Sequence, residues 1–180
     1  MPSETQLDAL SVRRQLIARD QQETVNFAFV DDALLTQWQL RDGLVPLANP
    51  LSAELAVMRP SLLPGLVATL GRNAARQLGR VRLFELGRVF AQQAGDASPG
   101  ESRPAPLETP RVAAAVCGDA QAVQWGLPTR KVDFHDLKGD LESLAAASGA
   151  QLEFRPSTRA CSRRWRSRPM SMPSSWTWSR

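Results

Sequence analysis

The chain has 180 residues, a length that suits a single domain with a sizeable buried core. No stretch is apolar enough to span a membrane, and residues 1–10 hold no apolar run, which argues against a secretory signal. The formal charge of +4 is unevenly spread: residues 155–180 hold seven arginines and no acid, whereas residues 1–154 hold 15 basic and 18 acidic residues, net −3. Cys117 and Cys161 fit no metal or disulfide spacing, which indicates reduced thiols in the cytoplasm.

The N-terminal part predicts a helix followed by a strand. A Ser3-x-x-Gln6 capping box starts a helix that runs to about Asp20. Residues 23–30 alternate apolar and polar side chains, as a strand does. The residues expected to face inward are Leu7, Leu10, Leu16 and Ile17 in the helix and Val25, Phe27 and Phe29 in the strand.

Short elements follow. Asp31 or Asp32 is expected to cap a short helix that ends near Trp38, and residues 44–47 form a short extended piece. Residues 52–58 predict a helical turn and then a strand that leads into Arg59.

Residues 61–79 predict an amphipathic helix. Ser61 is a suitable cap, and Pro64 is tolerated in the first turn because the amide there has no helical partner anyway. Gly79 is the expected stop. The buried stripe consists of Leu63, Leu66, Val67, Leu70, Ala74 and Leu78.

Residues 80–91 read as a strand covered on both faces. Gly87 interrupts the run where a bulge or a close backbone approach would fit. Glu85 and Arg88 lie three residues apart and so point to opposite faces, unless a bulge at Gly87 realigns them. We therefore predict that they have partners elsewhere in the fold and do not form one site together.

The remaining elements complete an α+β order. Residues 92–110 are rich in Gly, Pro, Ser and charge and predict an exposed connector, and residues 111–118 predict a buried strand. Residues 132–149 predict an amphipathic helix that stops at Gly149, and residues 152–154 start another strand. No Gly-rich phosphate loop is present in the sequence. The apolar face of the last helix holds Phe134, Leu137, Leu141 and Leu144.

Four sequence blocks carry a family resemblance. They are ETVNFAFVDDALL (23–35), LANPLSAELAVMRPSLLPGLVATLGRNAAR (47–76), VRLFELGRVF (81–90) and VDFHDLKGDLESL (132–144). In this order and spacing they resemble the C-terminal core of the beta subunit of bacterial phenylalanyl-tRNA synthetases. The resemblance covers roughly residues 1–156, and the tail 157–180 does not share it.

This resemblance implies a class II synthetase-like core, a mainly antiparallel sheet flanked by helices. It also implies a cytoplasmic heterotetramer of two alpha and two beta chains that attaches phenylalanine to its tRNA with ATP and magnesium. In that family the alpha subunit carries the active site and this part of beta is a non-catalytic copy of it. We therefore expect no catalytic, cofactor or metal residue in this chain, an alpha subunit as its partner, tRNA contact through the whole enzyme, and no membrane association.

The end of the strand 80–91 agrees with a non-catalytic role. Catalytic class II cores continue this strand into an arginine that grips the ATP phosphates, a task suited to a bidentate guanidinium. Here Ala91, Gln92 and Gln93 follow Phe90, and no Gly-x-Gly-x-x-Arg pattern occurs. A neutral methyl group cannot neutralise phosphate charge.

Asp133, His135, Asp136 and Asp140 invite a metal hypothesis. Hard ions need several converging oxygens from a shaped loop, and zinc needs more His or Cys than the chain offers. We interpret the acids instead as a solvated helix face whose first-turn carboxylates are stabilised by the helix dipole. His135 is the one histidine, and no serine or cysteine is arranged to use it as a base.

Arg72, Arg76, Arg80 and Arg82 could face RNA or simply be solvated. Because the body of the chain has a net charge of −3, the solvated interpretation is favoured.

The tail 157–180 holds no Leu, Ile, Val or Phe but three of the five tryptophans, Trp165, Trp176 and Trp178. One explanation is a basic arm that binds RNA by stacking, which would make the chain a free-standing RNA-binding module. The other is a shifted reading frame, since the frame one base earlier allows strand-like residues around 170–173 and 175–179. Either way, residues from about 158 onward are predicted to be disordered.

Overall fold

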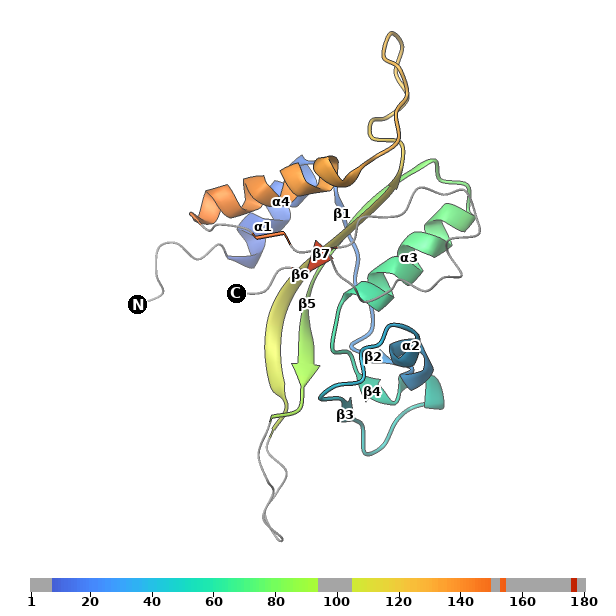
Figure 1. Cartoon of the computed structure of the whole chain (residues 1–180), viewed down its shortest axis with the longest axis vertical. Coiled ribbons are helices and arrows are strands. Elements are labelled where there is room, and N and C mark those ends of the chain that lie inside the picture. Colours follow the sequence, from blue (N-terminus) through green and yellow to red (C-terminus); the bar gives the residue numbers. More distant parts are fainter. Residues whose placement is uncertain (1–7, 94–104, 150–152, 155–175, 178–180) are drawn as a thin grey trace.

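The computed structural model of the chain describes residues 8–93, 105–149, 153–154 and 176–177 (Figure 1). None of the helices in these ranges is long and apolar enough to cross a membrane. The helices are α1 (Ala9–Ala18), α2 (Asp32–Gln37), the 3-10 turn η1 (Ala53–Leu55), α3 (Leu63–Ala75) and α4 (Phe134–Ser148). The strands are β1 (Gln22–Glu23), β2 (Phe29–Val30), β3 (Val45–Pro46), β4 (Val57–Met58), β5 (Arg80–Ala91), β6 (Leu107–Gly118) and β7 (Trp176–Thr177).

The fold is α+β with mainly antiparallel pairing, as the sequence predicts. The larger sheet has the order β1-β5-β6-β7, and its centre is a long antiparallel ribbon in which β5 and β6 pair without a break from Arg80↔Gly118 to Ala91↔Leu107. β1 runs parallel to β5, whereas β7 runs antiparallel to β6. The smaller sheet, β2-β4-β3, is wholly antiparallel.

Helices cover both faces of the ribbon. Because successive side chains of a strand point to opposite faces, Leu83 packs under α3 whereas Phe84 packs with α1 and α4. Figure 1 shows α1 and α4 together on one side of the ribbon and α3 with the smaller sheet on the other. The α3-side core contains Leu62, Leu66, Leu70, Val81, Leu83, Ala113, Ala115 and Cys117. The opposite core contains Leu16, Phe84, Ala114, Val116 and Leu137.

The first helix differs from the sequence prediction in its start and its buried stripe. Asp8 is its N-cap and accepts a hydrogen bond from the Ser11 amide at 2.7 Å, whereas Ser3 and Gln6 lie outside the described residues. Leu16 is fully buried, but Leu10 and Ile17 are half-exposed. The helix meets the sheet and α4 along one narrow stripe, so these two flanking apolar residues stay at the surface.

The single strand predicted over 23–30 is wrong. The chain forms two short strands, β1 and β2, and the side chains of Val25 and Phe27 between them are 87% and 75% exposed. The reason is Asn26, whose side-chain amide turns inward to donate to Glu85 Oε2 at 2.7 Å. With the polar residue facing inward, its apolar neighbours point outward.

The helix α3 also ends differently. Its N-cap position is Leu62, although Ser61 Oγ still accepts from the Leu63 amide at 3.3 Å. The helix stops after Ala75, and Gln77 takes a positive φ of 62°, so the chain turns before Gly79 and leaves Leu78 half-exposed.

The other predicted elements are largely confirmed. Helix α2 is capped by Asp31, α4 is capped by Asp133 and ends at the left-handed Gly149, and η1, β3 and β4 lie where expected. The connector is shorter than predicted because β6 begins at Leu107 and pairs with the end of β5. Residue 152 lies outside the described residues, and residues 153–154 have no strand assignment.

Two residues of the tail lie in the described part of the chain, and the disorder expected from about residue 158 onward stays a prediction. Trp176–Thr177 form β7, whose partners on β6 are Ala114 and Ala113. The outer edge of β6 offers unpaired backbone groups, and a short stretch of residues with high strand propensity can use them. The rest of 157–180, including Trp165 and Trp178, lies outside the described residues.

Candidate functional site

A cavity of about 380 Å³ lies at the end of the β5–β6 ribbon, a volume within the range of small-molecule sites. Its floor is the sheet, with Val89, Phe90 and Ala91 from β5 and Leu107, Thr109 and Arg111 from β6. Its other wall consists of Leu40, Asp42 and Pro60. In Figure 1 this region lies where the β5 arrowhead approaches β3 and the neighbouring loops.

Strand register explains why these side chains converge. Directly opposed residues of an antiparallel pair share a face, and the pairs here are Val89↔Thr109, Ala91↔Leu107 and Gly87↔Arg111. The odd-numbered residues of both strand ends therefore point to the side that carries α3 and the smaller sheet.

Two backbone hydrogen bonds hold the opposite wall in place. The Phe90 amide donates to Arg59 O at 3.0 Å, which fixes the chain just before Pro60. The Gln92 amide donates to Gly43 O at 2.8 Å, which fixes the loop that contains Asp42. Gly43 has a φ of +63°, a left-handed conformation that glycine adopts without strain.

The cavity contains one uncommitted cation. Arg111 is half-buried, and within the described ranges its guanidinium has no ion-pair or hydrogen-bond partner. Asp42 on the facing wall is exposed. Ala91, the position predicted to lack the phosphate-gripping arginine, presents only a methyl group. One cation facing a carboxylate does not suit the triphosphate of ATP.

Glu85 has its partner elsewhere in the fold, as predicted. Arg59 Nη1 donates to Glu85 Oε1 at 2.6 Å, and both side chains are more than nine-tenths buried. Asn26 donates to both carboxylate oxygens, and Arg59 Nε donates to Arg88 O at 2.9 Å. Arg88 lies on the opposite face and pairs with Glu108 at 2.5 Å. This cluster is structural: its donors and acceptors are taken up by one another.

Gly87 makes room for this pair, which confirms the close approach expected at that position. A Cβ there would overlap Arg59 Nη2 and would lie 3.0 Å from Leu62 Cδ2. The strand register stays continuous through Gly87, so no bulge is needed.

The acids of α4 divide into two groups. Asp133 and Asp136 form a capping box at the start of α4, and Asp136 also pairs with Arg130 at 2.7 Å. The Arg130 hydrogen bond lowers the pKa of Asp136 from 3.8 to about 2. The solvated-face interpretation is wrong for Asp140, which is buried and pairs with Arg82.

No metal site is assembled from these residues. Within the described ranges, no group of three or more His, Cys, Asp or Glu side chains is placed to hold a metal ion. Asp140 instead accepts from Arg82 and from Gln21 Nε2, the latter at 2.7 Å.

The four arginines considered as a patch are not one surface. Arg82 is buried, which contradicts the solvated interpretation for that residue, and Arg80 is half-buried and pairs with Asp20. Arg72 is exposed and donates to Thr69 Oγ1 at 2.7 Å, and Arg76 is exposed.

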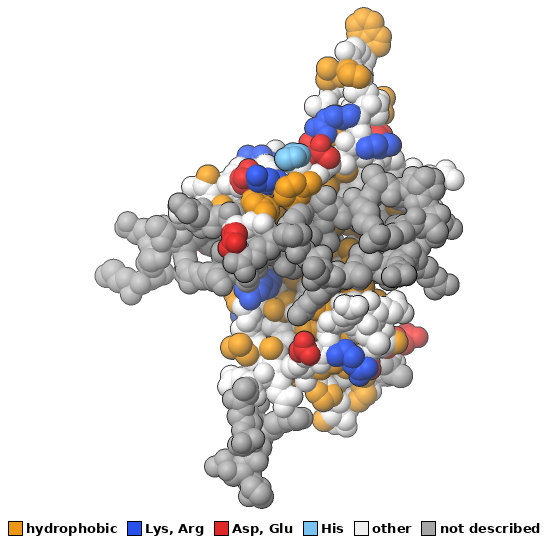
Figure 2. Space-filling view, viewed as in Figure 1, with side chains coloured by type: hydrophobic (Ala, Val, Ile, Leu, Met, Phe, Trp, Pro, Cys, Tyr) orange, Lys and Arg blue, Asp and Glu red, His pale blue; other side chains and the backbone are white. Residues whose placement is uncertain are grey.

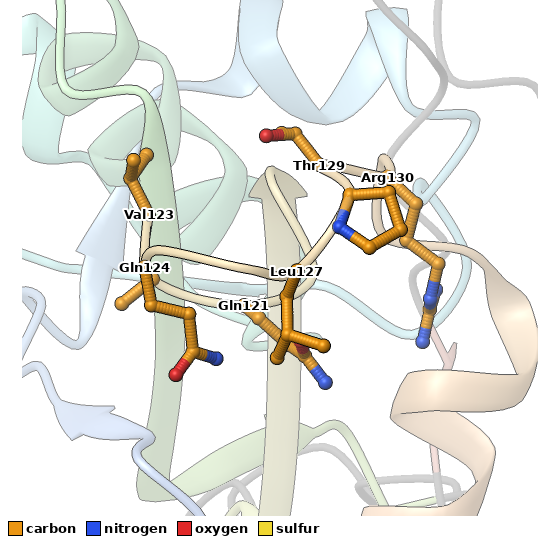
Figure 3. Close-up of a pocket in the computed structure, with 8 residues that line it drawn as sticks. Gln121, Val123, Gln124, Leu127, Thr129 and Arg130 are labelled. Atoms are coloured by element: carbon orange, nitrogen blue, oxygen red, sulfur yellow. The ribbon is translucent and has the colours of Figure 1, made fainter.

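A hairpin over residues 119–132 extends β6 beyond the body of the molecule. Trp125 is fully exposed and Val123 is 85% exposed at its tip, visible as the apolar end of the arm in Figure 2. Figure 3 shows the side chains fanning outward around the bent loop. The space they enclose is only about 10 Å³, roughly one water, so the hairpin holds no small-molecule site.

Sequence reasoning missed Arg111, the partnership of Arg59 with Glu85, and the exposed hairpin tip. The uncharged run 121–129 contains Gly126 and Pro128 next to a tryptophan, and this turn-forming pair could have indicated an exposed loop. Arg111 gave no such signal, because only strand register brings it beside Gly87.

Comparison with known proteins agrees with this architecture. A family profile described as "Phenylalanyl tRNA synthetase beta chain CLM domain" matches residues 2–167, beyond the boundary at 156 expected from the sequence. The phenylalanine–tRNA ligase beta subunit of Xanthomonas axonopodis pv. citri is 76% identical over 160 residues, and that of Xylella fastidiosa strain Temecula1 is 70% identical over 159. Each alignment covers 88% of this chain and 19% of the relative, so the chain spans about a fifth of their length.

Among solved structures, a pyrrolysyl tRNA synthetase from Desulfitobacterium hafniense is similar with a TM-score of 0.50. The match covers 83% of this chain and 48% of that one at 15% identity, so it concerns the fold alone. From the profile match and the close relatives, we conclude that the chain belongs to the phenylalanyl-tRNA synthetase beta chain family.

Proposed function

We propose that the chain is a non-catalytic scaffold segment of phenylalanine–tRNA ligase, the enzyme that attaches phenylalanine to its tRNA with ATP. The observation that carries this proposal is the cavity at the end of β5. It has the size of a ligand site, yet it presents Ala91 and a single uncommitted guanidinium where a nucleotide would need several phosphate contacts.

The position within the beta subunit is part of the same proposal. The four sequence blocks and the helix-flanked antiparallel sheet favour a class II-like core in the C-terminal part of the beta chain. The fold-level likeness to a pyrrolysyl tRNA synthetase is consistent with that core.

Assembly with an alpha subunit in the cytoplasm is the expected role. Large apolar side chains are strongly exposed on the chain, some of them close together in sequence, and an alpha subunit that packed against them would remove them from water. They include Val25, Phe27, Leu51, Val123 and Trp125.

Co-expression with the cognate alpha subunit tests the proposal. The two chains should elute together from size exclusion, and the isolated chain should show no phenylalanine-dependent pyrophosphate exchange. Exchange by the isolated chain, or failure to bind alpha, would contradict the scaffold role.

The alternative is a free-standing RNA-binding module that uses the Arg- and Trp-rich tail 157–180. It predicts RNA binding that survives moderate salt and disappears when the tail is deleted. The scaffold predicts weak, steeply salt-dependent binding that the deletion changes little.

A further inference from the structure

We propose that the cavity at the end of the β5–β6 ribbon binds a small monocarboxylate with an apolar body, and that the Arg111 guanidinium holds the carboxylate. This goes beyond the scaffold role, because it gives the non-catalytic core a ligand of its own. The proposal depends on the charges of the cavity, its apolar lining and the rigidity of its walls.

Among the described residues, the arginines Arg59 and Arg111 lie on this face of the ribbon, and they differ in their hydrogen bonding. Gly87 lies under the Arg59 guanidinium and is the register partner of Arg111. The Arg59 guanidinium donates hydrogen bonds to the Glu85 carboxylate and to the carbonyls of Asn26, Phe27 and Arg88. Arg111 lacks such partners in the described part of the chain and is half-buried, so its fork of N–H groups is available to an incoming anion.

The facing wall sets the charge of that anion. Asp42 lies on the wall opposite the sheet, where its carboxylate opposes a second negative charge on a ligand. A phosphate dianion would meet that repulsion with one guanidinium to offset it. A carboxylate carries a single charge and matches the planar fork of an arginine, with the Thr109 hydroxyl on the same face as a further donor.

The other side chains that line the cavity favour a ligand with an apolar body. Leu40, Pro60, Val89, Ala91 and Leu107 contribute hydrocarbon surface to a space of about 380 Å³. The two segments that form the wall opposite the sheet are each joined to the β5 end by a backbone hydrogen bond, so the shape of the space does not depend on side-chain contacts alone. Leu107 is 51% exposed, and a bound alkyl or aryl group would cover it.

Amide-resolved NMR titration of the 180-residue chain with three six-carbon probes tests this site. Hexanoate should bind with a Kd on the order of millimolar, as expected for about eight non-hydrogen atoms, and should shift the amides of residues 89–91, 107–109 and 111. Hexylammonium and hexyl phosphate should each bind about tenfold more weakly. Absence of saturable shifts with hexanoate, or equal binding of hexylammonium, overturns the proposal.

Amino-acid substitutions in the cavity test which side chains bind hexanoate. Arg111→Gln should weaken hexanoate about tenfold, as expected for loss of a charge-assisted hydrogen-bonded pair. The matched control is Arg88→Gln, which removes an exposed arginine from the other face of the same ribbon and should change hexanoate affinity less than about twofold. Ala91→Phe should fill the cavity and abolish binding, while an unchanged spectrum elsewhere shows that the fold is intact. Full affinity in Arg111→Gln or in Ala91→Phe overturns the site.

Discussion

The two faces of the β5–β6 ribbon each bury one arginine–carboxylate pair, and the two pairs are built differently. On the α3 face, Arg59 and Glu85 are joined by Asn26, and each carboxylate oxygen has a donor. On the α1/α4 face, Arg82 pairs with Asp140, but Arg82 Nε and Gln21 Oε1 are buried and have no hydrogen-bond partner among the described residues.

The difference shows which pair the fold depends on. The Arg59 cluster joins four segments: the loop at Asn26, the end of β4, the strand β5 and, through Thr69, the helix α3. Arg82 and Asp140 join β5 to α4, beside a core of apolar side chains that already holds these elements together. A buried ion pair stabilises a fold only where its geometry and hydrogen bonding are complete.

The largest effect is expected from Arg59→Ala. Removing this guanidinium leaves the buried Glu85 carboxyl with only the Asn26 donors, and it leaves the Arg88 carbonyl without this donor. The free energy of unfolding should fall by about 3–5 kcal/mol, measured by urea denaturation. Arg88→Ala, which removes an exposed pair on the same strand, should cost less than about 1 kcal/mol. Equal losses for the two variants would contradict the structural role of the cluster.

Double replacements sharpen the comparison. Arg82→Met with Asp140→Leu removes both charges and the unpartnered Arg82 Nε but leaves the single Gln21 amide donor without its acceptor, so it should cost about 1 kcal/mol. Arg59→Met with Glu85→Leu leaves the Asn26 amide donors unsatisfied and should cost about 2 kcal/mol more. Thermal unfolding of both double variants tests this order of stability. If the Arg82/Asp140 variant is the less stable of the two, the polar atoms left without partners carry no penalty.

Glycine substitutions test the space beside the Arg59–Glu85 pair. Gly87→Ala places a methyl group against Arg59 and Leu62 and should destabilise by about 1–3 kcal/mol. Gly139→Ala in α4 is the control. In the described part of the chain, a Cβ there would meet nothing within 4 Å apart from its own stretch of helix, and alanine favours a helix, so it should stabilise by about 0.5–1 kcal/mol. If both substitutions change the free energy of unfolding in the same direction, measured by urea denaturation, this contradicts the close approach of Arg59 to Gly87.

Periodicity predicted the elements whose burial is regular and failed where a polar residue turns inward. The strand β5 and the helix α4 follow simple apolar patterns, and both lie where expected. The segment around Val25 and Phe27 has an equally regular pattern, but the hydrogen bonds of Asn26 to Glu85 reverse it. Such a long-range polar contact has no local signature.

The candidate site shows the same limit. The neutral side chain at Ala91 is visible in the sequence, but the cavity beside it depends on strand register and on two loops tied to β5. Arg111 becomes notable only when Gly87 is seen opposite it. Distant segments meet there through backbone pairing, which composition and spacing do not encode.

The smallest effect concerns Asp136, outside both buried pairs. Its pKa is held at about 2 by Arg130, below the ordinary 3.8, so its stabilising contribution is complete above about pH 4 and is lost as the pH falls toward 2. The Arg130 side chain is 54% exposed, so solvent screening limits the contribution to less than about 1 kcal/mol. Asp136→Asn keeps an oxygen for the Asp133 amide but loses the charge. In urea denaturation, the free energy of unfolding of this variant should be lower than that of the parent at pH 6 and equal to it near pH 2. If the difference stays constant between these pH values, it comes from the helix cap and not from the ion pair.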